Sequence, residues 1–389
     1  MKILLVHNYY LQPGGEDVAF QSEMELLRRY GHEVRTFEDH NARIANLNPV
    51  SLALGTIWSE KSRKRLTELL EKETPEIVHF QNTFPLISPS AYYACHQAKA
   101  AVVQSLQNYR LLCPVATFYR DNHVCEDCLG KAITWPGILH ACYRSSYSQS
   151  ALVTAMLVAH RILGTWQSLV DAYIALTRFS QAKFVEGGLP SRKIFLKPNF
   201  VVSDPGRKQE NGNFALFVGR LSEEKGIRTL LSAWRPLSIP LKIVGDGPLR
   251  QDLFYELSKF NVGEVEYLGS LPHAGVLTLM KRARILIFPS QWYEGFPLTI
   301  AEAFACALPI IASDIGSQAE IVRNGYSGLH FRAGDVTDLR EKIQWCFRNP
   351  EEVSRMGENA RREYEENYTA ENNYLQLMDI YSHALGNRV

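Results

Sequence analysis

Residues 288–304 carry the richest chemistry in the chain, with the sequence FPSQWYEGFPLTIAEAF. The pattern predicts a strand end, a turn and a helix. Pro297 fits the first helical position, which leaves the amides of Leu298 and Thr299 free at the positive end of the helix dipole. Helix starts of this kind bind phosphate groups. The segment therefore predicts a site for an anion such as a diphosphate.

Two carboxylates of this segment suit the two ends of one ligand. Glu302 lies one turn into the expected helix, where it can accept hydrogen bonds from both hydroxyls of a ribose. Glu294 precedes the helix and can reach a sugar ring. A bare pair of glutamates at this spacing usually marks an ordinary helix start, and it is the Gly-Phe-Pro context that favours a binding site.

A second anion-binding group is expected at residues 217–226, FVGRLSEEKG. Gly219 permits close approach of the backbone, and Arg220 and Lys225 place two cations at the carboxyl end of a strand. Ligands of open α/β sheets bind at that edge. The two cations can neutralise a diphosphate leaving group. The alternative is a solvated basic loop.

Gly14 and Gly15 follow the first expected strand and open the first helix. The backbone of this turn can therefore approach a phosphate. The pair does not complete a G-x-G-x-x-G motif, and no acidic residue follows the second strand as a dinucleotide site requires. A plain tight turn explains the two glycines equally well.

Short apolar runs alternate with helical patterns along the chain, which predicts an α/β fold with two Rossmann-like, doubly wound domains. A helix over Glu16–Tyr30 should end at Gly31, and residues 351–385 form one continuous helical pattern. The expected strands are Lys2–Val6, Val34–Phe37, Ile77–Phe80, Ala101–Ser105, Ala172–Leu176 and Ile194–Leu196, then Phe214–Val218, Leu241–Val244, Val265–Leu268, Ile285–Phe288, Ile310–Ala312 and Gly328–Phe331.

Residues 197–213 are rich in Pro, Gly and Asn and predict an interdomain linker. The expected domains are residues 1–198 and 199–365. Residues 107–150 interrupt the alternation of strands and helices, and they predict an insertion in the first domain.

The insertion holds four of the seven cysteines, in the pattern C-x11-C-x2-C-x13-C. Four thiolates suit a tetrahedral zinc ion, and His123 or His140 could replace one of them. We hypothesise a structural zinc site, with four free thiols as an equally weighted alternative. The proposed ligands are Cys113, Cys125, Cys128 and Cys142.

The bulk charge selects no polyanionic partner, because 42 basic and 41 acidic residues give a net charge of +1. Nucleic acid is therefore not expected as a partner. The first apolar run is too short for a signal peptide, and the longest, residues 151–159, falls short of the ~18 residues of a spanning helix. These features predict a cytoplasmic chain. A helix over residues 151–166 is interpreted as core packing, or alternatively as a surface for a lipid-linked acceptor at the inner face of the membrane.

Taken together, these residues resemble the GT-B glycosyltransferases, in particular the large family-four group of retaining enzymes, over almost the whole chain. The resemblance implies transfer of a sugar from a UDP- or GDP-sugar to a glycan or lipid-linked acceptor, in cell-surface polysaccharide or glycoconjugate assembly. It also implies that residues 366–389 cross back onto the first domain. The implied donor contacts are Arg220 and Lys225 for the diphosphate, Glu302 for the ribose, Glu294 with the segment Gly295, Phe296, Pro297 and Leu298 for the sugar and phosphate, and Gly15 for the phosphate.

The resemblance further implies front-face attack, in which the leaving phosphate accepts the proton of the acceptor hydroxyl. No Asp-x-Asp motif stands out, so catalysis is expected to need no metal ion. Many relatives carry a histidine after the fourth strand, where this chain has Gln107. An amide can hydrogen-bond a hydroxyl but cannot carry a proton as imidazole does. Gln107 is therefore expected to contact substrate, and a nucleotide-sugar epimerase and a non-catalytic nucleotide-sugar-binding protein remain alternatives.

Overall fold

The computed structural model describes residues 1–12, 14–208, 212–260 and 264–386. The chain divides into two compact units, which are described separately below. Unit 1 comprises Met1–Phe118, Cys125–Asn199 and Asn373–Val389, and unit 2 comprises Tyr119–Val124 and Phe200–Asn372. Residues 209–211 of the expected linker and residues 387–389 of the expected returning segment lie outside the described residues.

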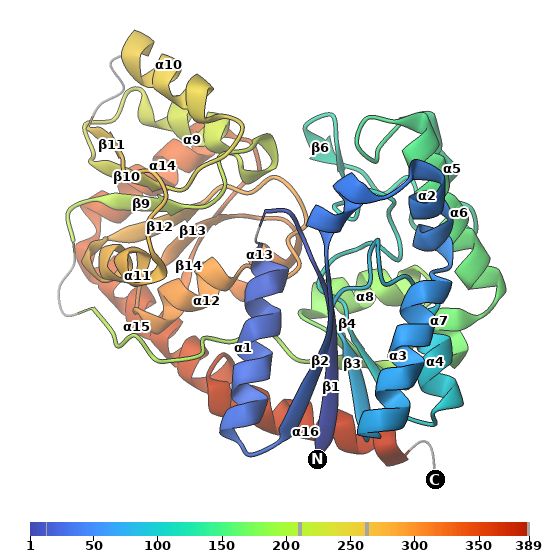
Figure 1. The fold of residues 1–389 in the computed structure, drawn as a ribbon. Helices are drawn as coiled ribbons and strands as arrows, with labels where there is room; N and C mark the ends of the chain where they lie inside the picture. The colour runs from blue at the N-terminus through green and yellow to red at the C-terminus, as the bar shows by residue number, and fades with distance from the viewer. Residues whose placement is uncertain (13, 209–211, 261–263, 387–389) are drawn as a thin grey trace. The chain divides into compact units, whose positions relative to one another are not determined.

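Unit 1 is built on a six-stranded parallel sheet with the spatial order β2-β1-β3-β4-β7-β8. Helix α1 lies on one side of β1–β3 and helices α3 and α4 lie on the other (Figure 1). The strands are β1 (Lys2–Tyr9), β2 (Glu33–His40), β3 (Ile77–Phe80), β4 (Ala101–Ser105), β7 (Ala172–Ala175) and β8 (Ile194–Leu196). The helices are α1 (Gly15–Arg29), η1 (Asn41–Asn46), α2 (Pro49–Ile57), α3 (Glu60–Glu73), α4 (Ala91–Gln97), α5 (Trp135–Leu139), α6 (Tyr147–Ile162), α7 (Thr165–Ser168), α8 (Arg178–Glu186) and η2 (Ser191–Lys193).

Unit 2 repeats this architecture, with the strand order β11-β10-β9-β12-β13-β14. Helices α9 and α14 pack on one face of the sheet through a buried core that includes Leu230, Trp234 and Ile343. The strands are β9 (Ala215–Val218), β10 (Leu241–Val244), β11 (Val265–Tyr267), β12 (Ile285–Phe288), β13 (Ile310–Ser313) and β14 (Gly328–Phe331). The helices are η3 (Glu223–Lys225), α9 (Ile227–Trp234), α10 (Arg250–Phe260), α11 (His273–Arg282), α12 (Leu298–Ala305), α13 (Gly316–Ile321), α14 (Val336–Arg348) and α15 (Pro350–Asn367). The last helix, α16 (Ala370–Gly386), belongs to unit 1 from Asn373 onward.

Every strand expected from the apolar runs is present, and the α/β fold class with two doubly wound sheets is confirmed. The helix after β1 ends as expected, because Gly31 follows it with a φ of +79°. Strand β1 is longer than expected. It pairs with β2 through His7, Asn8 and Tyr9, beyond the end of the apolar run.

The prediction of one continuous C-terminal helix is wrong. The chain forms α15 and α16, which are separated at Tyr368 and Thr369. The Tyr368 carbonyl accepts a hydrogen bond from the Val201 amide at 3.0 Å, which is a partner outside both helices. The Thr369 hydroxyl accepts one from the Asn372 amide at 3.2 Å and starts the next helix.

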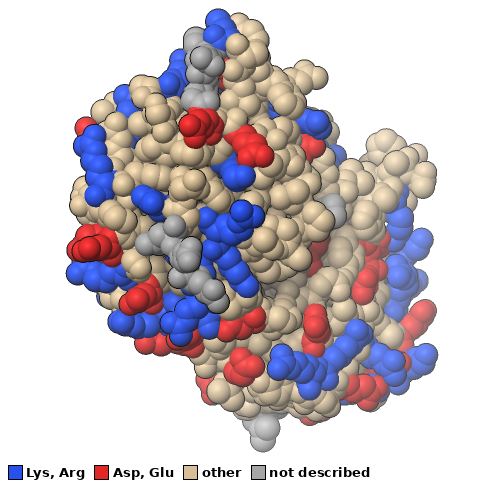
Figure 2. All heavy atoms as spheres, turned by 90° about the vertical axis from the view of Figure 1, so that its left-hand side faces the viewer, with Lys and Arg blue, Asp and Glu red and all other residues tan. Residues whose placement is uncertain are grey.

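Residues 107–150 contain a short antiparallel hairpin, β5 (Tyr119–Arg120) and β6 (His123–Val124), and the helix α5 among turns. Helix α6 buries Val153, Met156 and Leu157, so most of its apolar face packs against protein. In the described residues, no helix is long and apolar enough to cross a membrane. On the face shown in Figure 2, Lys and Arg side chains are interspersed with Asp and Glu.

Candidate nucleotide-sugar site

The loops after β9 and β12 meet at the point where the strand order of the second sheet reverses. From β9 the chain proceeds outward to β10 on one side, whereas β12 on the other side leads outward to β13. In open α/β sheets, ligands bind beyond the carboxyl ends of the strands at such a reversal. The two loops touch, because the amide of Gln291 donates to the carbonyl of Glu224 at 2.8 Å.

A glycine makes this close approach possible. Gly226 has a φ of +71°, and a Cβ atom there would lie 1.9 Å from the carbonyl oxygen of Pro289. Any larger residue would push the two loops apart. Gly245, in the loop after β10, has the same role, because its Cβ would lie 1.9 Å from the Gly219 carbonyl oxygen. The sequence interpretation missed Gly245, although the V-G-D-G-P segment after an expected strand was a usable signal.

Lys225 and Glu294 form a direct ion pair across the two loops, with Nζ 2.7 Å from Oε1. The same carboxylate oxygen accepts a hydrogen bond from the Ser290 hydroxyl at 2.6 Å. Glu294 is buried, and the Lys225 ammonium lies 5.4 Å from the centre of the Trp292 ring. The sequence placed these two residues at one ligand but did not anticipate their pairing or the role of Ser290.

Arg220 contrasts with Lys225, because its side chain is exposed and makes no hydrogen bond or ion pair with any residue that the structure describes. The neighbouring Gly219 amide donates to the Val244 carbonyl at 3.0 Å, which anchors the loop to the next strand. The loop after β9 thus presents one fixed cation, Lys225, and one that is free to bind an anion.

Helix α12 begins at Leu298, one residue later than expected, so Pro297 is its N-cap. No backbone carbonyl in the described parts of the chain accepts from the amides of Leu298 and Thr299. These amides lie at the positive end of the helix dipole. Gly295 and Phe296 lead into the helix, and the Phe296 ring is buried 5.4 Å from that of Tyr368. The loop end is therefore held by packing while the first helical amides stay open.

Glu302 is paired with a histidine that the sequence interpretation missed. His273 Nε2 lies 2.7 Å from Glu302 Oε1. Burial raises the pKa of the Glu302 carboxyl, and the hydrogen bond from His273 partly opposes this shift. His273 follows a Leu-Pro segment at the start of α11, and no motif in that segment marks it as part of a site.

The raised pKa predicts a pH-dependent affinity for nucleotide if Glu302 accepts the ribose hydroxyls. We expect nucleotide to bind more weakly as the pH is lowered from about 7 towards that pKa, because a protonated carboxyl is a poorer acceptor. His273→Ala should move the midpoint of this loss to higher pH. Isothermal titration calorimetry over the pH series, with Glu302→Gln as the variant expected to lose the dependence, checks the prediction; an unchanged pH profile in Glu302→Gln would contradict it.

In unit 1, Gly14 is the N-cap of α1, and its amide donates to Asp17 Oδ2 at 2.9 Å. A Cβ atom on Gly14 or Gly15 would meet no atom within 4 Å among the residues that the structure describes, the chain neighbours apart. The two glycines are therefore not required by packing within the protein. The open space beside them is what close approach of a ligand to the backbone needs.

Gln107 is part of a polar network in unit 1, in which its Oε1 accepts from Asn199 Nδ2 at 3.4 Å. Its Nε2 donates to Gln81 Oε1 at 3.0 Å, and Gln81 Nε2 donates to Glu23 Oε1 at 2.9 Å. Lys197 Nζ donates to Glu23 Oε2 at 2.9 Å and to Asn373 Oδ1 at 3.0 Å. The network thus joins helix α1, the segment after β8 and helix α16 to the residue that follows β4.

His79 is part of the same network. Its Nδ1 lies 2.8 Å from Glu23 Oε1 and 2.8 Å from the Tyr381 hydroxyl, and its Nε2 lies 2.8 Å from Ser105 Oγ. Both ring nitrogens are therefore used inside the fold.

The structure does not support the zinc site expected at Cys113, Cys125, Cys128 and Cys142. No group of three or more His, Cys, Asp or Glu side chains in the described residues is arranged to hold a metal ion. Burial, with smaller effects from the other three thiols, raises the pKa of Cys128 to about 12.

The two doubly wound sheets have the GT-B fold. The family model described as "Glycosyl transferases group 1" matches residues 202–363 of this chain. The chain is 31% identical to O-antigen chain mannosyltransferase C of Escherichia coli over 178 residues, which are 45% of this chain and 48% of that protein. The resemblance to GT-B glycosyltransferases expected from sequence is confirmed.

Two further proteins extend the comparison. Over 126 residues, 32% of each chain, this chain is 33% identical to N,N'-diacetylbacillosaminyl-diphospho-undecaprenol alpha-1,3-N-acetylgalactosaminyltransferase of Campylobacter jejuni. Anabaena Alr3699/HepE, solved in complex with UDP-glucose, has the same fold, with a TM-score of 0.70 at 15% identity over 98% of this chain and 99% of that one. The matches to these curated relatives span less than half of their length.

Proposed function

We propose that the protein transfers a sugar from a nucleotide-diphosphate sugar, UDP- or GDP-linked, to a glycan or lipid-linked acceptor with retention of anomeric configuration. The observation that carries the proposal is the convergence, at the β9/β12 reversal, of Lys225, free Arg220 and the open amides of Leu298 and Thr299. Four donor groups of this kind suit the two phosphates of a diphosphate.

In the proposed reaction, the bond between the sugar anomeric carbon and the diphosphate oxygen breaks, and a bond to the acceptor oxygen forms on the same face. The acceptor proton passes to the leaving diphosphate. An ammonium has three N–H donors, so Lys225 can bind Glu294 and still donate to phosphate. Arg220 and the helix amides would stabilise the growing negative charge, and catalysis would need no metal ion.

The remaining expected contacts belong to the same proposal. Glu302 would accept the ribose hydroxyls, and Glu294, held by Ser290 and Lys225, would accept hydroxyls of the donor sugar. Gly219 would let the backbone come close to the diphosphate. In residues 1–198, Gly14 and Gly15 would contact a donor phosphate and Gln107 a sugar hydroxyl. The UDP-glucose complex of Anabaena HepE supports a nucleotide-sugar donor.

The acceptor is proposed to be lipid-linked, at a peripheral membrane surface. The Campylobacter relative is named for a diphospho-undecaprenol substrate, which is a lipid diphosphate. The E. coli relative is named for an O-antigen chain. Both names support a place in polysaccharide or glycoconjugate assembly.

A thermal-shift screen of UDP, GDP, ADP and their sugars tests the donor. A matched nucleotide at about 100 times its dissociation constant should stabilise the protein by roughly 2.7 kcal/mol. The matched sugar nucleotide, incubated without acceptor, should give slow hydrolysis and no epimer. Accumulation of an epimer would instead identify an epimerase, and binding with neither hydrolysis nor transfer to any acceptor would leave only a binding protein.

A further inference from the structure

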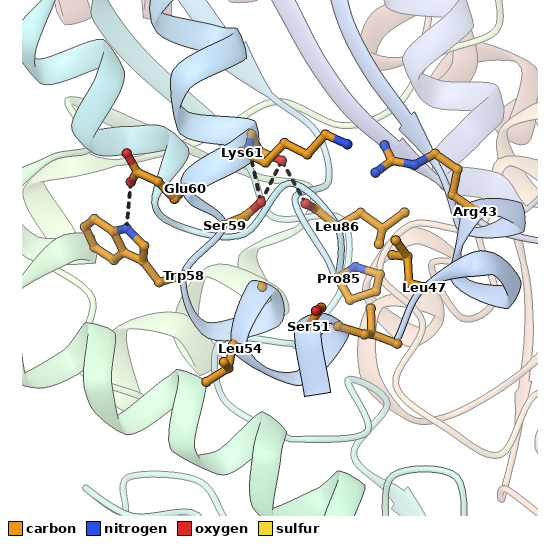
Figure 3. A pocket seen from close by; sticks show the side chains of 13 residues that line it. Arg43, Leu47, Ser51, Leu54, Trp58, Ser59, Glu60, Lys61, Pro85 and Leu86 are labelled. Carbon is orange, nitrogen blue, oxygen red and sulfur yellow. Dashed lines mark hydrogen bonds between the residues drawn. The ribbon is translucent and has the colours of Figure 1, made fainter. Parts of the chain in front are cut away.

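A pocket of about 350 Å³ lies within unit 1, among η1, α2, the start of α3 and the loop after β3 (Figure 3). Segment η1 follows β2, and Pro85 and Leu86 follow β3. The pocket is therefore at the carboxyl edge of the first sheet, where open α/β sheets bind ligands. None of the residues assigned to the donor lines it.

The lining of the pocket is divided between cations and apolar groups. In Figure 3, the Lys61 side chain extends toward the guanidinium group of Arg43. Arg43 is paired with Asp39, whereas Lys61 is exposed and has no hydrogen bond or ion pair with any described residue. The apolar lining comes from Leu47, Leu52, Leu54, Trp58, Pro85 and Leu86.

The acidic side chain in the lining is already occupied. Glu60 accepts from Arg63 Nη2 at 2.7 Å and from Trp58 Nε1 at 3.4 Å. It therefore does not neutralise Lys61. Because Arg43 is balanced by Asp39, the uncompensated positive charge of the lining is that of Lys61, while most of the other lining side chains are apolar. This combination matches an anionic amphiphile.

The surface beside the pocket has the same two characters. Helix α2 leaves Val50 and Leu54 exposed by 67% and 65%, and Trp58, the residue after the helix, is exposed by 37%. The first two turns of α3 contain Lys61, Arg63, Lys64 and Arg65. Exposed apolar side chains next to clustered cations are typical of surfaces that meet lipid with anionic headgroups.

We propose that this pocket binds the diphosphate and the first hydrocarbon units of an isoprenoid-type lipid diphosphate acceptor. Its phosphates would lie between Arg43 and Lys61, with the hydrocarbon on Leu47, Leu54 and Leu86. The volume is at the lower end of the about 300–1,000 Å³ of small-ligand sites, so the rest of the lipid lies outside, along the exposed side of α2. The inference rests on the proposed function and names the acceptor site for it.

Calorimetric titration of the full chain with farnesyl diphosphate, inorganic pyrophosphate and farnesol tests the pocket. Farnesyl diphosphate should bind at least about tenfold more tightly than either fragment, because only it uses both ends of the pocket. Lys61→Glu should weaken its binding about tenfold or more, and Leu54→Asp should do the same. The matched controls, Lys72→Glu at the other end of the same helix and Leu375→Asp at an equally exposed leucine of α16, should change it by less than about twofold.

Three results would overturn the inference: equal binding of pyrophosphate, which means a simple anion site; equal binding of farnesol, which means an apolar groove; or wild-type affinity in Lys61→Glu. The nucleotide thermal shift, measured on the same samples, keeps the two proposals apart. If the parent protein shows a nucleotide shift but does not bind farnesyl diphosphate, only the proposal for the pocket is rejected. Farnesyl diphosphate binding without any nucleotide shift rejects the glycosyltransferase and leaves a lipid-diphosphate site.

Discussion

Lys225→Met is expected to lower kcat/KM for sugar transfer by about 10²–10³-fold, the range found when one preorganised charge-stabilising donor is removed from an active site. The physical reason is that negative charge grows on the leaving diphosphate in the transition state. Lys225 is fixed before the reaction by its 2.7 Å contact with Glu294 and needs no reorganisation to meet that charge. Steady-state kinetics with the matched donor measures the effect.

The control for this variant must separate catalysis from folding. Loss of Lys225 leaves the buried Glu294 carboxylate without its cation, which costs stability. Lys225→Met/Glu294→Gln keeps a side-chain partner for Ser290 and should recover the melting temperature but not the activity. Lys242→Met, which removes a surface pair with Glu266, should leave the melting temperature and the activity unchanged. Full activity in either Lys225 variant would refute the assignment of the diphosphate site.

Lys197→Met is expected to destabilise unit 1 by about 3–5 kcal/mol, because it leaves a buried carboxylate uncompensated. The side chains of Lys197 and Glu23 are 2% and 5% exposed, and their charged atoms lie 2.9 Å apart. Lys183→Met, which removes more exposed pairs with Glu126 and Glu186, should cost less than about 1 kcal/mol. Guanidinium unfolding followed by circular dichroism compares the first transition of each variant. Equal midpoints for the two variants would mean that removing the buried cation costs no more than removing the exposed one, which would contradict the prediction.

The same pair predicts how stability changes in acid. Burial alone raises the pKa of Glu23, but Lys197 and His79 outweigh it and lower the pKa from 4.5 to about 2. A carboxyl with a lowered folded-state pKa binds fewer protons when folded, so its contribution is complete above pH 4.5 and is lost as the pH falls to about 2. Lys197→Met should show a smaller loss of stability over this interval than the parent protein.

The network around Glu23 also bears on Gln107. Through Gln81, the amide of Gln107 is hydrogen-bonded to a carboxylate that Lys197 fixes in place. Its orientation therefore depends on residues from α1, from the segment after β8 and from α16. Nothing in the spacing of Glu23, Lys197 and Asn373 along the chain indicates that they meet, so this network could not be predicted from the sequence.

The sequence by itself determined the strand positions and the chemical character of the loops. Runs such as Ile77–Phe80 and Ile285–Phe288 are apolar throughout because both faces of a parallel sheet are covered, and this signal is local. Arg220, Lys225, Glu294 and Glu302 stood out for the same reason, since each follows a strand or begins a helix.

Only the tertiary structure decided what these side chains contact. The pairing of Lys225 with Glu294 and of His273 with Glu302, the polar extension of β1, and the break between α15 and α16 all depend on partners distant in sequence. The four clustered cysteines suggested zinc, yet spacing along the chain does not fix the geometry that a metal requires. Hydrogen bonds and ion pairs act over a few ångströms in space, so the fold must bring the residues together before their partners are defined.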